Sequence, residues 1–383
     1  MRLNSYDGFT RLREVIVGSG TGYTGHDRDL TFELFQQENL LHYDSWHYPR
    51  LAAGEAPERR AVHPQYVEEL IEDVEGLAET LVSLGVTVHR PLALPPDAGP
   101  IAGPGWSAIP TPALNIRDNT LIVGDEIIET PPMVRSRCLE TRLLAPLFRR
   151  CFDAGARWTA MPRPSLTDAS FDLSYARHAA AALGAGAVPY ARPGPYDAGH
   201  DMMLDGAQVM RLGRDLIVNT AQANHRSAAD WLERHLRGRF TVHRVERMAD
   251  SHIDATLLAL RPGVFLARHD RVRELLPRPL QGWKFIVPPE PDPADFPSYL
   301  PQDLLLTSPY IDLNVLSVDE TTARQHRRHR PPRHPRIQRL HSRSRTPPPP
   351  PALRRRPALL HPRHRARRRP WGVPELSVGS YFR

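Results

Sequence analysis

The sequence predicts an α/β protein built from repeated units, each with an apolar hairpin, a helix and a further strand. Two observations predict this class. Three segments read as apolar hairpins with a short polar turn, and two read as an amphipathic helix followed by glycine and a strand. Weak repetition of such units is typical of blades stacked about an axis. An ordinary α/β domain with surface acids remains the alternative at this point.

The N-terminal part of the sequence shows the first unit of helix, glycine and strand. Residues 14–18 (EVIVG) read as a buried strand that ends in glycine. Residues 66–85 place apolar side chains at helical spacing, with Gly85 as the C-terminal stop, and residues 86–88 alternate as a strand. The same order of helix, glycine and strand returns in residues 228–245.

Apolar hairpins lie between these units, and each has a carboxylate just before it. The hairpins span residues 119–129, 208–218 and 256–266. The preceding acids are Asp118, Asp205 and Asp254. A fourth strand of the same kind, residues 314–318 (NVLSV), runs into a polar segment where the next turn is expected. We therefore expect acids at the same end of several blades.

The composition changes after residue 322. Residues 323–383 hold 18 arginines, 12 prolines, six histidines and one acid, so they carry a net charge of +17, whereas residues 1–322 carry −10. The tail lacks an apolar period and cannot bury enough surface to offset its ordering entropy. We expect one domain over residues 1–322 and a disordered tail over residues 323–383. A nucleic-acid function inferred from the overall basic charge is excluded for the domain.

Cysteine usage and hydropathy narrow the class further. The two cysteines, Cys138 and Cys151, exclude a disulfide scaffold and a cysteine-rich zinc site. No apolar run reaches the roughly 18 residues of a membrane span, and the N-terminus lacks the apolar stretch of a signal peptide. We expect a soluble cytoplasmic protein.

One stretch, residues 251–256 (SHIDAT), has the residue types of an acid–base site. On an extended strand the spacing of His252 and Asp254 puts both side chains on one face. An imidazole beside a carboxylate suits proton transfer near neutral pH. Several carboxylates aimed at one pocket suit a planar cation, above all a guanidinium held by bidentate hydrogen bonds. Zinc is disfavoured for lack of a third His or Cys at a suitable spacing, and a structural role for the pair stays open.

A series of motifs in order carries a family resemblance. The motifs are REVIVG (13–18), RD (117–118), VGDEIIETPPMVRSRCLE (123–140), GARW (155–158), RLGRDL (211–216), SHIDAT (251–256), RPGVFLARHDR (261–271) and NVLSVDE (314–320). Over about residues 10–322 the sequence resembles the amidinotransferases, which include glycine amidinotransferase and the inosamine-phosphate amidinotransferases of aminoglycoside antibiotic biosynthesis. The resemblance implies a pentein fold, a five-bladed pseudo-symmetric α/β propeller, with its last blade incomplete in this chain.

The resemblance also implies a reaction. In such enzymes a cysteine thiolate attacks the guanidino carbon of arginine, ornithine leaves, and the amidino group passes to an amine, with no metal or organic cofactor. His252 resembles the general acid–base, and Asp205 resembles the carboxylate paired with it. Asp118 and Asp254 resemble the acids that hold the guanidinium.

Three further positions match substrate contacts of the family. Arg271 resembles the residue that binds the substrate carboxylate. Thr307 and Ser308 take the place of a polar pair that contacts substrate, with Thr where Ser is more usual. The implied partners are arginine and an amine acceptor (glycine, an aminocyclitol or another antibiotic precursor), and relatives imply a homodimer. No membrane or nucleic-acid partner is expected.

The nucleophile of the family has no counterpart in this chain. In such enzymes it lies near the C-terminus in a GGGFHC-like loop, and no cysteine follows Cys151. Cys138 and Cys151 stand on helix-like segments where the family has bulky apolar residues. We expect both to be core residues, because free cysteine is commonly buried.

The tail offers an explanation for the missing cysteine. The chain has 49 arginines and one lysine, which indicates GC-rich coding DNA. With suitable codons, residues 353–367 read one nucleotide later give Gly-Gly-Gly-Leu-His-Cys-Phe-Thr-Leu-Asp-Thr-Val-Arg, with the cysteine across the codons of Leu359 and Leu360. Residues 339–344 read in the same way give Gly-Phe-Thr-Pro-Val-Pro. We therefore expect a frameshift close to Thr322, in the gene or in its sequencing.

Three alternatives remain open. The tail could be a basic arm that binds nucleic acid or anionic surfaces by counterion release. The protein could be a hydrolytic pentein of the arginine deiminase type. It could also be a catalytically dead, guanidinium-binding regulatory protein. The nucleotide sequence across codons 315–370 separates the frameshift from an evolved tail.

Overall fold

A computed structural model gives the architecture of part of the chain. The described residues are 2–25, 29–31, 34, 62, 64–174, 199–249, 252–289, 313, 315–321, 323–325 and 376–378. The chain divides into one unit of Met1–Arg328 with Pro374–Arg383 and a second unit of His329–Val373. The second unit lies outside the described residues, so all that follows concerns the first.

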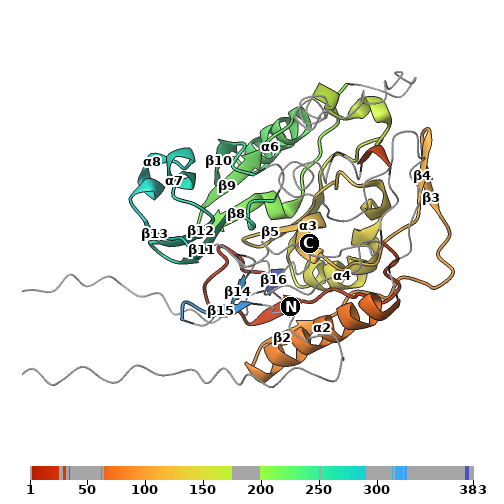
Figure 1. Cartoon of the computed structure of the whole chain (residues 1–383). Helices are drawn as coiled ribbons and strands as arrows, with labels where there is room; N and C mark the ends of the chain where they lie inside the picture. Colours follow the sequence, from red (N-terminus) through yellow and green to blue (C-terminus); the bar gives the residue numbers. More distant parts are fainter. Residues whose placement is uncertain are drawn as a thin grey trace, which may run out of the picture. The chain divides into compact units, whose positions relative to one another are not determined.

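Three sheets share one topology (Figure 1). In each, two strands form an antiparallel hairpin and a third strand runs parallel to the second. The nine strands are β5 (Thr120–Val123), β6 (Glu126–Glu129), β7 (Arg157–Ala160), β8 (Val209–Leu212), β9 (Asp215–Thr220), β10 (Thr241–Glu246), β11 (Leu257–Arg261), β12 (Val264–Ala267) and β13 (Lys284–Ile286). The three hairpins expected from the apolar alternation are confirmed.

Helical crossovers connect the second and third strands of these sheets, as parallel pairing requires. They are α4 (Ala145–Asp153), α6 (Ala223–His235), and the short helices α7 (Val272–Leu275) and α8 (Arg278–Gln281). The smaller elements on either side are α3 (Ile116–Asn119) and the 3₁₀ turns η1 (Arg135–Arg137), η2 (Glu140–Leu144), η3 (Asp168–Ser170) and η4 (Gly206–Gln208). The predicted α/β class is confirmed by this alternation of strands and helices.

The N-terminal sheet is formed by strands from both ends of the chain, all of them parallel. β1 (Glu14–Ile16) pairs in parallel with β2 (Thr87–His89) through α2 (Pro64–Ser83), the helix expected over residues 66–85. Val74 and Leu81 of α2 pack on the β1 side chains in one core cluster, as the helical apolar spacing predicts. The remaining edge of β1 is occupied by a strand from the far end of the chain.

Two short strands lie in the stretch expected to have no regular structure. β16 (Leu376–Val378) pairs with β1 in parallel, and β15 (Ala323–Gln325) pairs antiparallel with β14 (Val315–Ser317). These six residues pair although their stretch lacks an apolar period, because backbone hydrogen bonds in a sheet do not require apolar side chains. The disordered tail over residues 323–383 stays a prediction. The boundary expected at residue 322 falls inside the β14–β15 hairpin.

Neighbouring sheets pack against each other through shared cores. One cluster combines Leu121 of β5 with Leu216 of β9 and Leu232 of α6. The next combines Ile217 of β9 with Phe265 of β12. Consecutive sheets thus lie face to face, which brings the starts of their first strands toward one another. A separate hairpin, β3 (Ile101–Gly103) and β4 (Trp106–Ala108), completes the described strands.

The expected propeller of five blades is visible only in part. Within the described residues the sheets remain separate, with three or two strands each, and none closes on itself. Across that same part of the chain, no helix has the length and apolar character needed to cross a membrane.

Candidate active site

Three chain segments that precede the first strands of the hairpin sheets meet in the interior. α3 carries Asp118, the turn η4 has Asp205 as its N-cap, and the loop before β11 carries His252. The Ile253 N–H donates to the Ala207 carbonyl at 3.1 Å, which fixes the third segment to the second. These contacts follow from the face-to-face packing of consecutive sheets.

The close approach of α3 and η4 depends on a glycine. A Cβ on Gly206 would lie 2.3 Å from the Arg117 carbonyl oxygen, a distance that only a side chain without Cβ avoids. The residue next to Asp205 therefore has a steric reason for being glycine. This packing holds Asp205 against the segment that carries Asp118.

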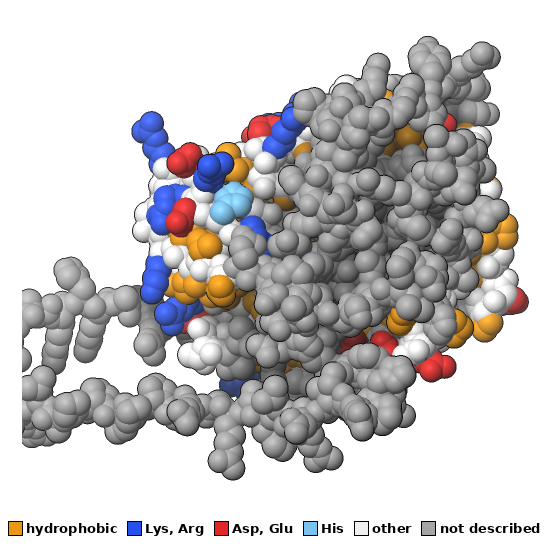
Figure 2. Space-filling model, viewed as in Figure 1, with side chains coloured by type: hydrophobic (Ala, Val, Ile, Leu, Met, Phe, Trp, Pro, Cys, Tyr) orange, Lys and Arg blue, Asp and Glu red, His pale blue; other side chains and the backbone are white. Residues whose placement is uncertain are grey.

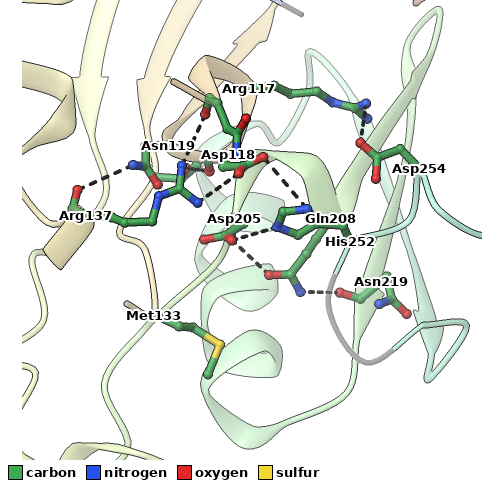
Figure 3. Close-up of polar contacts among 12 residues, drawn as sticks. Arg117, Asp118, Asn119, Met133, Arg137, Asp205, Gln208, Asn219, His252 and Asp254 are labelled. Carbon is green, nitrogen blue, oxygen red and sulfur yellow. Dashed lines mark hydrogen bonds and ion pairs between the residues drawn. The ribbon is translucent and has the colours of Figure 1, made fainter. Parts of the chain in front are cut away.

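His252 lies between two carboxylates (Figure 3). Its Nε2 is 2.8 Å from Asp205 Oδ2, and its Nδ1 is 3.8 Å from Asp118 Oδ1. All three side chains are buried, each 2% exposed. Asp205 is oriented by a capping box, in which the Gln208 side-chain oxygen accepts from the Asp205 N–H at 2.9 Å. The arrangement is an imidazole held in place by one acid and facing another.

A buried arginine holds the far side of Asp118. Arg137 Nη1 donates to Asp118 Oδ2 at 2.8 Å, and its Nε and Nη2 donate to Glu140 at 2.8 and 2.9 Å. Burial favours the neutral form of Arg137, but the charges of Glu140 and Asp118 outweigh it and raise the pKa of Arg137 well above its ordinary value. Arg137 is therefore a permanent positive charge behind the carboxylates.

The other expected guanidinium-binding acid already has an arginine beside it. Arg117 Nη1 donates to Asp254 Oδ2 at 3.1 Å, and its Nη2 donates to the Val209 carbonyl at 3.2 Å. Asp254 is 2% exposed. This carboxylate is positioned to hold a guanidinium, and the chain itself supplies one.

The structure brings together some of the expected site residues and not others. Asp118, Asp205 and His252 form one buried cluster, and Asp254 is tied to it through Arg117 on α3. Arg271 is exposed at the N-cap of α7, and among the described residues no hydrogen bond joins its side chain to that cluster. Thr307 and Ser308 lie outside the described residues.

Exposed charged side chains cover the part of the surface formed by the sheet β11–β12–β13. Figure 2 shows basic side chains there with acidic ones among them. The exposed basic residues of this segment include Arg261, Arg271, Arg278 and Lys284.

Sequence reasoning did not assign Arg137 and Glu140 to the site. Both lie in the motif RSRCLE, so their presence was visible, but an arginine in a helical segment is ordinarily exposed. Only the fold shows that Arg137 is buried against Asp118, a residue 19 positions earlier. The sequence pattern that could have indicated this pair is a basic and an acidic residue three positions apart, Arg137 and Glu140, in an apolar segment.

Neither thiol in the chain is an activated nucleophile. Cys151 packs in a core cluster of buried apolar side chains, and Cys138 is half-buried. Burial raises the pKa of each thiol to about 11, so both stay protonated near neutral pH. The expectation that these are core residues is confirmed for Cys151.

The three clustered side chains also have the spacing of a possible metal site. One ligand atom each from Asp118, Asp205 and His252 lies within 4.8 Å of the others. Asp205 and His252 already bond to each other, and Arg137 neutralises part of the Asp118 charge. These bonds fit an acid–base site better than a cation site.

A second buried histidine, His225 of α6, makes stability pH-dependent. Its Nδ1 accepts from the Ala221 N–H at 3.2 Å, its Nε2 is 3.0 Å from Met133 Sδ, and burial lowers its pKa to about 3. The unfolded chain takes up this proton below about pH 6.5 and the folded chain does not, so stability is complete above pH 6.5 and is lost as pH falls toward 3. We expect urea unfolding of His225→Gln to show a pH slope smaller by about 1.4 kcal/mol per unit between pH 6 and 4. Equal slopes in both proteins would contradict this assignment.

Taken together, the α/β fold and the His252–Asp205 pair define a class: α/β proteins with a buried histidine held between carboxylates. No family model matches the chain. It is 32% identical over 310 residues to inosamine-phosphate amidinotransferase 1 of Streptomyces griseus, which covers 80% of each protein. The chain belongs to the amidinotransferase family, a family of transferases.

Further relatives carry different acceptors in their names. The chain is 32% identical over 252 residues to the L-arginine:L-lysine amidinotransferase of Pseudomonas savastanoi pv. phaseolicola, covering 65% of each protein. It is 31% identical over 267 residues to the mitochondrial glycine amidinotransferase of Danio rerio, covering 67% of this chain and 59% of that protein. The chain thus spans less than two thirds of these two relatives.

Solved structures agree with the family. An inosamine-phosphate amidinotransferase from Streptomyces griseus has a TM-score of 0.66 at 29% identity, covering 84% of each chain. An amidinotransferase of the saxitoxin biosynthetic pathway from Microseira wollei has a TM-score of 0.61 at 27% identity, covering 83% of each chain. The fold described above is therefore the fold of this family.

Proposed function

We propose that this protein is built to transfer an amidino group from arginine to an amine acceptor. The observation that carries the proposal is the buried His252, bonded to Asp205 and facing Asp118. Two carboxylates, Asp118 and Asp254, hold the arginine guanidinium, and Arg271 binds the carboxylate of the substrate. His252 gives a proton to the departing ornithine amine and removes one from the incoming amine. Asp205 fixes the orientation of the imidazole for both steps.

The covalent step requires a thiolate that the 383-residue chain does not supply. Attack on the guanidino carbon forms an S–C bond, and the C–N bond to ornithine breaks as His252 donates its proton. The acceptor amine then attacks the amidino carbon, and the thiolate leaves. We propose that the nucleophile belongs to a C-terminal loop whose reading frame is lost near residue 322.

The strand pairing supports this position for the missing segment. β5, β8 and β11 each run antiparallel to the next strand of their sheet, and each follows an acid of the site. The equivalent place beside β1 is taken by β16, which runs parallel. An antiparallel strand beside β1 would bring the residues next to it, the missing nucleophile among them, toward the acids that precede β5, β8 and β11.

The sequence of β15 also supports a change of frame. Second strands of the complete sheets read EIIE, DLIVNT and VFLA, whereas β15 in the same place reads ARQ. A strand that packs between sheets needs apolar residues on its buried face. We propose that residues 1–322 are the native domain and that residues 323–383 are out of frame.

Further parts of the proposal follow from the family. We propose a five-bladed pentein propeller, with β14–β15 as the incomplete fifth blade, a homodimer, and a cytoplasmic location. The acceptor is a primary amine, and the names of relatives offer glycine, lysine and inosamine phosphates. A role in antibiotic biosynthesis belongs to the last of these.

A second function has its own observation. Both thiols have pKa values raised to about 11 by burial, so the chain as written lacks a nucleophile while keeping its carboxylates. Such a chain acts as a guanidinium-binding protein without turnover. A hydrolytic activity of the arginine deiminase type has no separate observation in its favour.

Equilibrium binding tests the guanidinium site in the 383-residue protein. We expect calorimetry to show binding of L-arginine, and about 100-fold weaker binding of citrulline, because the neutral urea group forfeits charge-assisted hydrogen bonds to Asp118 and Asp254. Asp118→Asn should remove most of the difference between the two ligands. Equal affinity for arginine and citrulline would refute the proposed substrate.

A further inference from the structure

The motif RSRCLE contributes Arg137 and Glu140 to a buried ionic network around Asp118, and the proposed chemistry gives neither of these two residues a role. Arg137 is 5% exposed, and its partners Asp118 and Glu140 are 2% and 5% exposed. Charged groups are rarely so deep in a protein unless each is paired. Burying these charged groups costs desolvation free energy. We therefore expect the network to have a role in the site that it adjoins.

Each of the three guanidinium nitrogens of Arg137 donates to at least one acceptor. Nε and Nη2 grip Glu140 in a bidentate pair, and Nη2 also reaches the Asn115 carbonyl at 3.3 Å. Nη1 is left for Asp118 Oδ2, at 2.8 Å. The contacts with Glu140 and Asn115 alone therefore fix the plane of the guanidinium, and Asp118 binds to a group that is already oriented.

Glu140 is itself held by two neighbours. Thr111 Oγ1 donates to Glu140 Oε1 at 2.8 Å, and Asn119 Nδ2 donates to Glu140 Oε2 at 2.6 Å. Asn119 is adjacent to Asp118 on α3. The contacts that run from Asn119 through Glu140 and Arg137 to Asp118 form a clamp. The clamp begins and ends on α3, which leaves the Asp118 carboxylate little freedom to rotate.

Only one oxygen of Asp118 is used by the clamp. Oδ1 is buried and has no hydrogen-bond partner among the described residues, and it faces His252 (Figure 3). A buried carboxylate oxygen without a donor is costly, and an arriving guanidinium N–H removes that cost. Of the two Asp118 oxygens, Oδ1 is therefore the one that can still accept a hydrogen bond from a ligand.

We propose that Arg137 is a positioning residue for guanidinium binding: it holds Asp118 by Oδ2 so that Oδ1 points at the substrate. The inference rests on the proposed function, because it assumes a guanidinium ligand. Arg137 acts through Asp118 and does not touch the ligand. It also supplies a positive charge that offsets the repulsion between Asp118 and Asp205.

Loss of that charge has a second consequence at His252. The charged groups that face this imidazole are Asp205 from η4 and Asp118 from α3, with Arg137 and Glu140 from η1 and η2 behind Asp118. Arg117 and Asp254 pair with each other at the side. Removing Arg137 leaves net negative charge around His252, which favours its protonated form.

The experiment compares two arginines of the same motif in the full-length chain. Arg137→Lys keeps the charge and loses the fork, whereas Arg137→Met removes both. Arg135→Met is the matched control, since Arg135 is also 5% exposed and pairs with Asp168, away from the cluster. Each variant is measured by thermal unfolding, by calorimetric titration with L-arginine, and by NMR titration of the His252 ring.

The proposal makes distinct forecasts for each variant. Arg137→Lys should weaken arginine binding by about tenfold and Arg137→Met by about 100-fold, and only Arg137→Met should move the His252 titration midpoint to higher pH. Arg135→Met should lower thermal stability and leave both readouts unchanged. Wild-type affinity and an unmoved His252 midpoint in folded Arg137→Met would overturn the inference. Failure of the wild-type chain to bind arginine would count against the proposed function, and the His252 midpoint would still decide the role of Arg137.

Discussion

The 383-residue chain is expected to release no measurable ornithine from arginine, and a chain with the restored frame is expected to release it steadily. The thiolate forms the bond to the guanidino carbon, and neither Asp205 nor His252 replaces it. Loss of a covalent nucleophile removes rate on the order of 10⁶-fold in the protease where it was measured. The assay follows ornithine with glycine, lysine and other primary amines as acceptors. Re-sequencing codons 315–370 precedes it and shows where the frame changes.

Two controls separate this result from a general effect of the new tail. The restored chain with its new cysteine changed to alanine should be as inactive as the original, although it carries the rest of the restored C-terminal segment. Arginine binding should be similar in all three proteins, because Asp118 and Asp254 precede the change of frame. Robust ornithine release by the original chain would refute the frameshift proposal and leave Cys138 or Cys151 as the nucleophile.

Changing His252 to alanine in the restored protein is expected to lower kcat by about 10³-fold, within the range for loss of a general acid–base. Without His252, the departing amine of ornithine receives no proton, and no group removes the proton from the incoming acceptor amine. KM for arginine should change little, since the carboxylates that hold the guanidinium remain. Asp205→Asn should cost less, because the imidazole persists but loses the acceptor 2.8 Å away.

A steady-state comparison decides this assignment. A loss confined to KM would mean that His252 binds substrate and transfers no proton. Partial recovery of His252→Ala by added imidazole would support the proton-transfer role. Unchanged kcat in His252→Ala would remove His252 from the mechanism and with it the main argument for the proposed reaction.

Much of the architecture was predictable because local rules decide it. The hairpins that follow Asp118, Asp205 and Asp254 need only period-two alternation and a polar turn, and all three were placed correctly. The helix over residues 64–83 was found within two residues of its ends. The convergence of the acids follows from repetition of one unit, which a sequence displays directly.

Other features depend on contacts that no local rule encodes. The pairing of Asp254 with Arg117 joins residues 137 positions apart, and the pairing of Asp118 with Arg137 requires the burial of a charged side chain. Arg271 lies exposed at the N-cap of α7, and its expected contact with the substrate carboxylate stays a prediction. Strand β16 was unforeseen because parallel pairing of three residues leaves no pattern in the sequence.

The pairing of β16 with β1 bears on the order in which the molecule folds. It joins Glu14 to Leu376, two residues roughly 360 positions apart, and the entropy lost in closing a loop grows with its length. His252 and Asp205 are separated by 47 positions, so their contact closes a far shorter loop. The carboxylate cluster is accordingly expected to assemble early, from the consecutive sheets alone, and the ends of the chain to meet last. Whatever sequence follows residue 322, the nascent protein already carries the cluster of His252, Asp205 and Asp118.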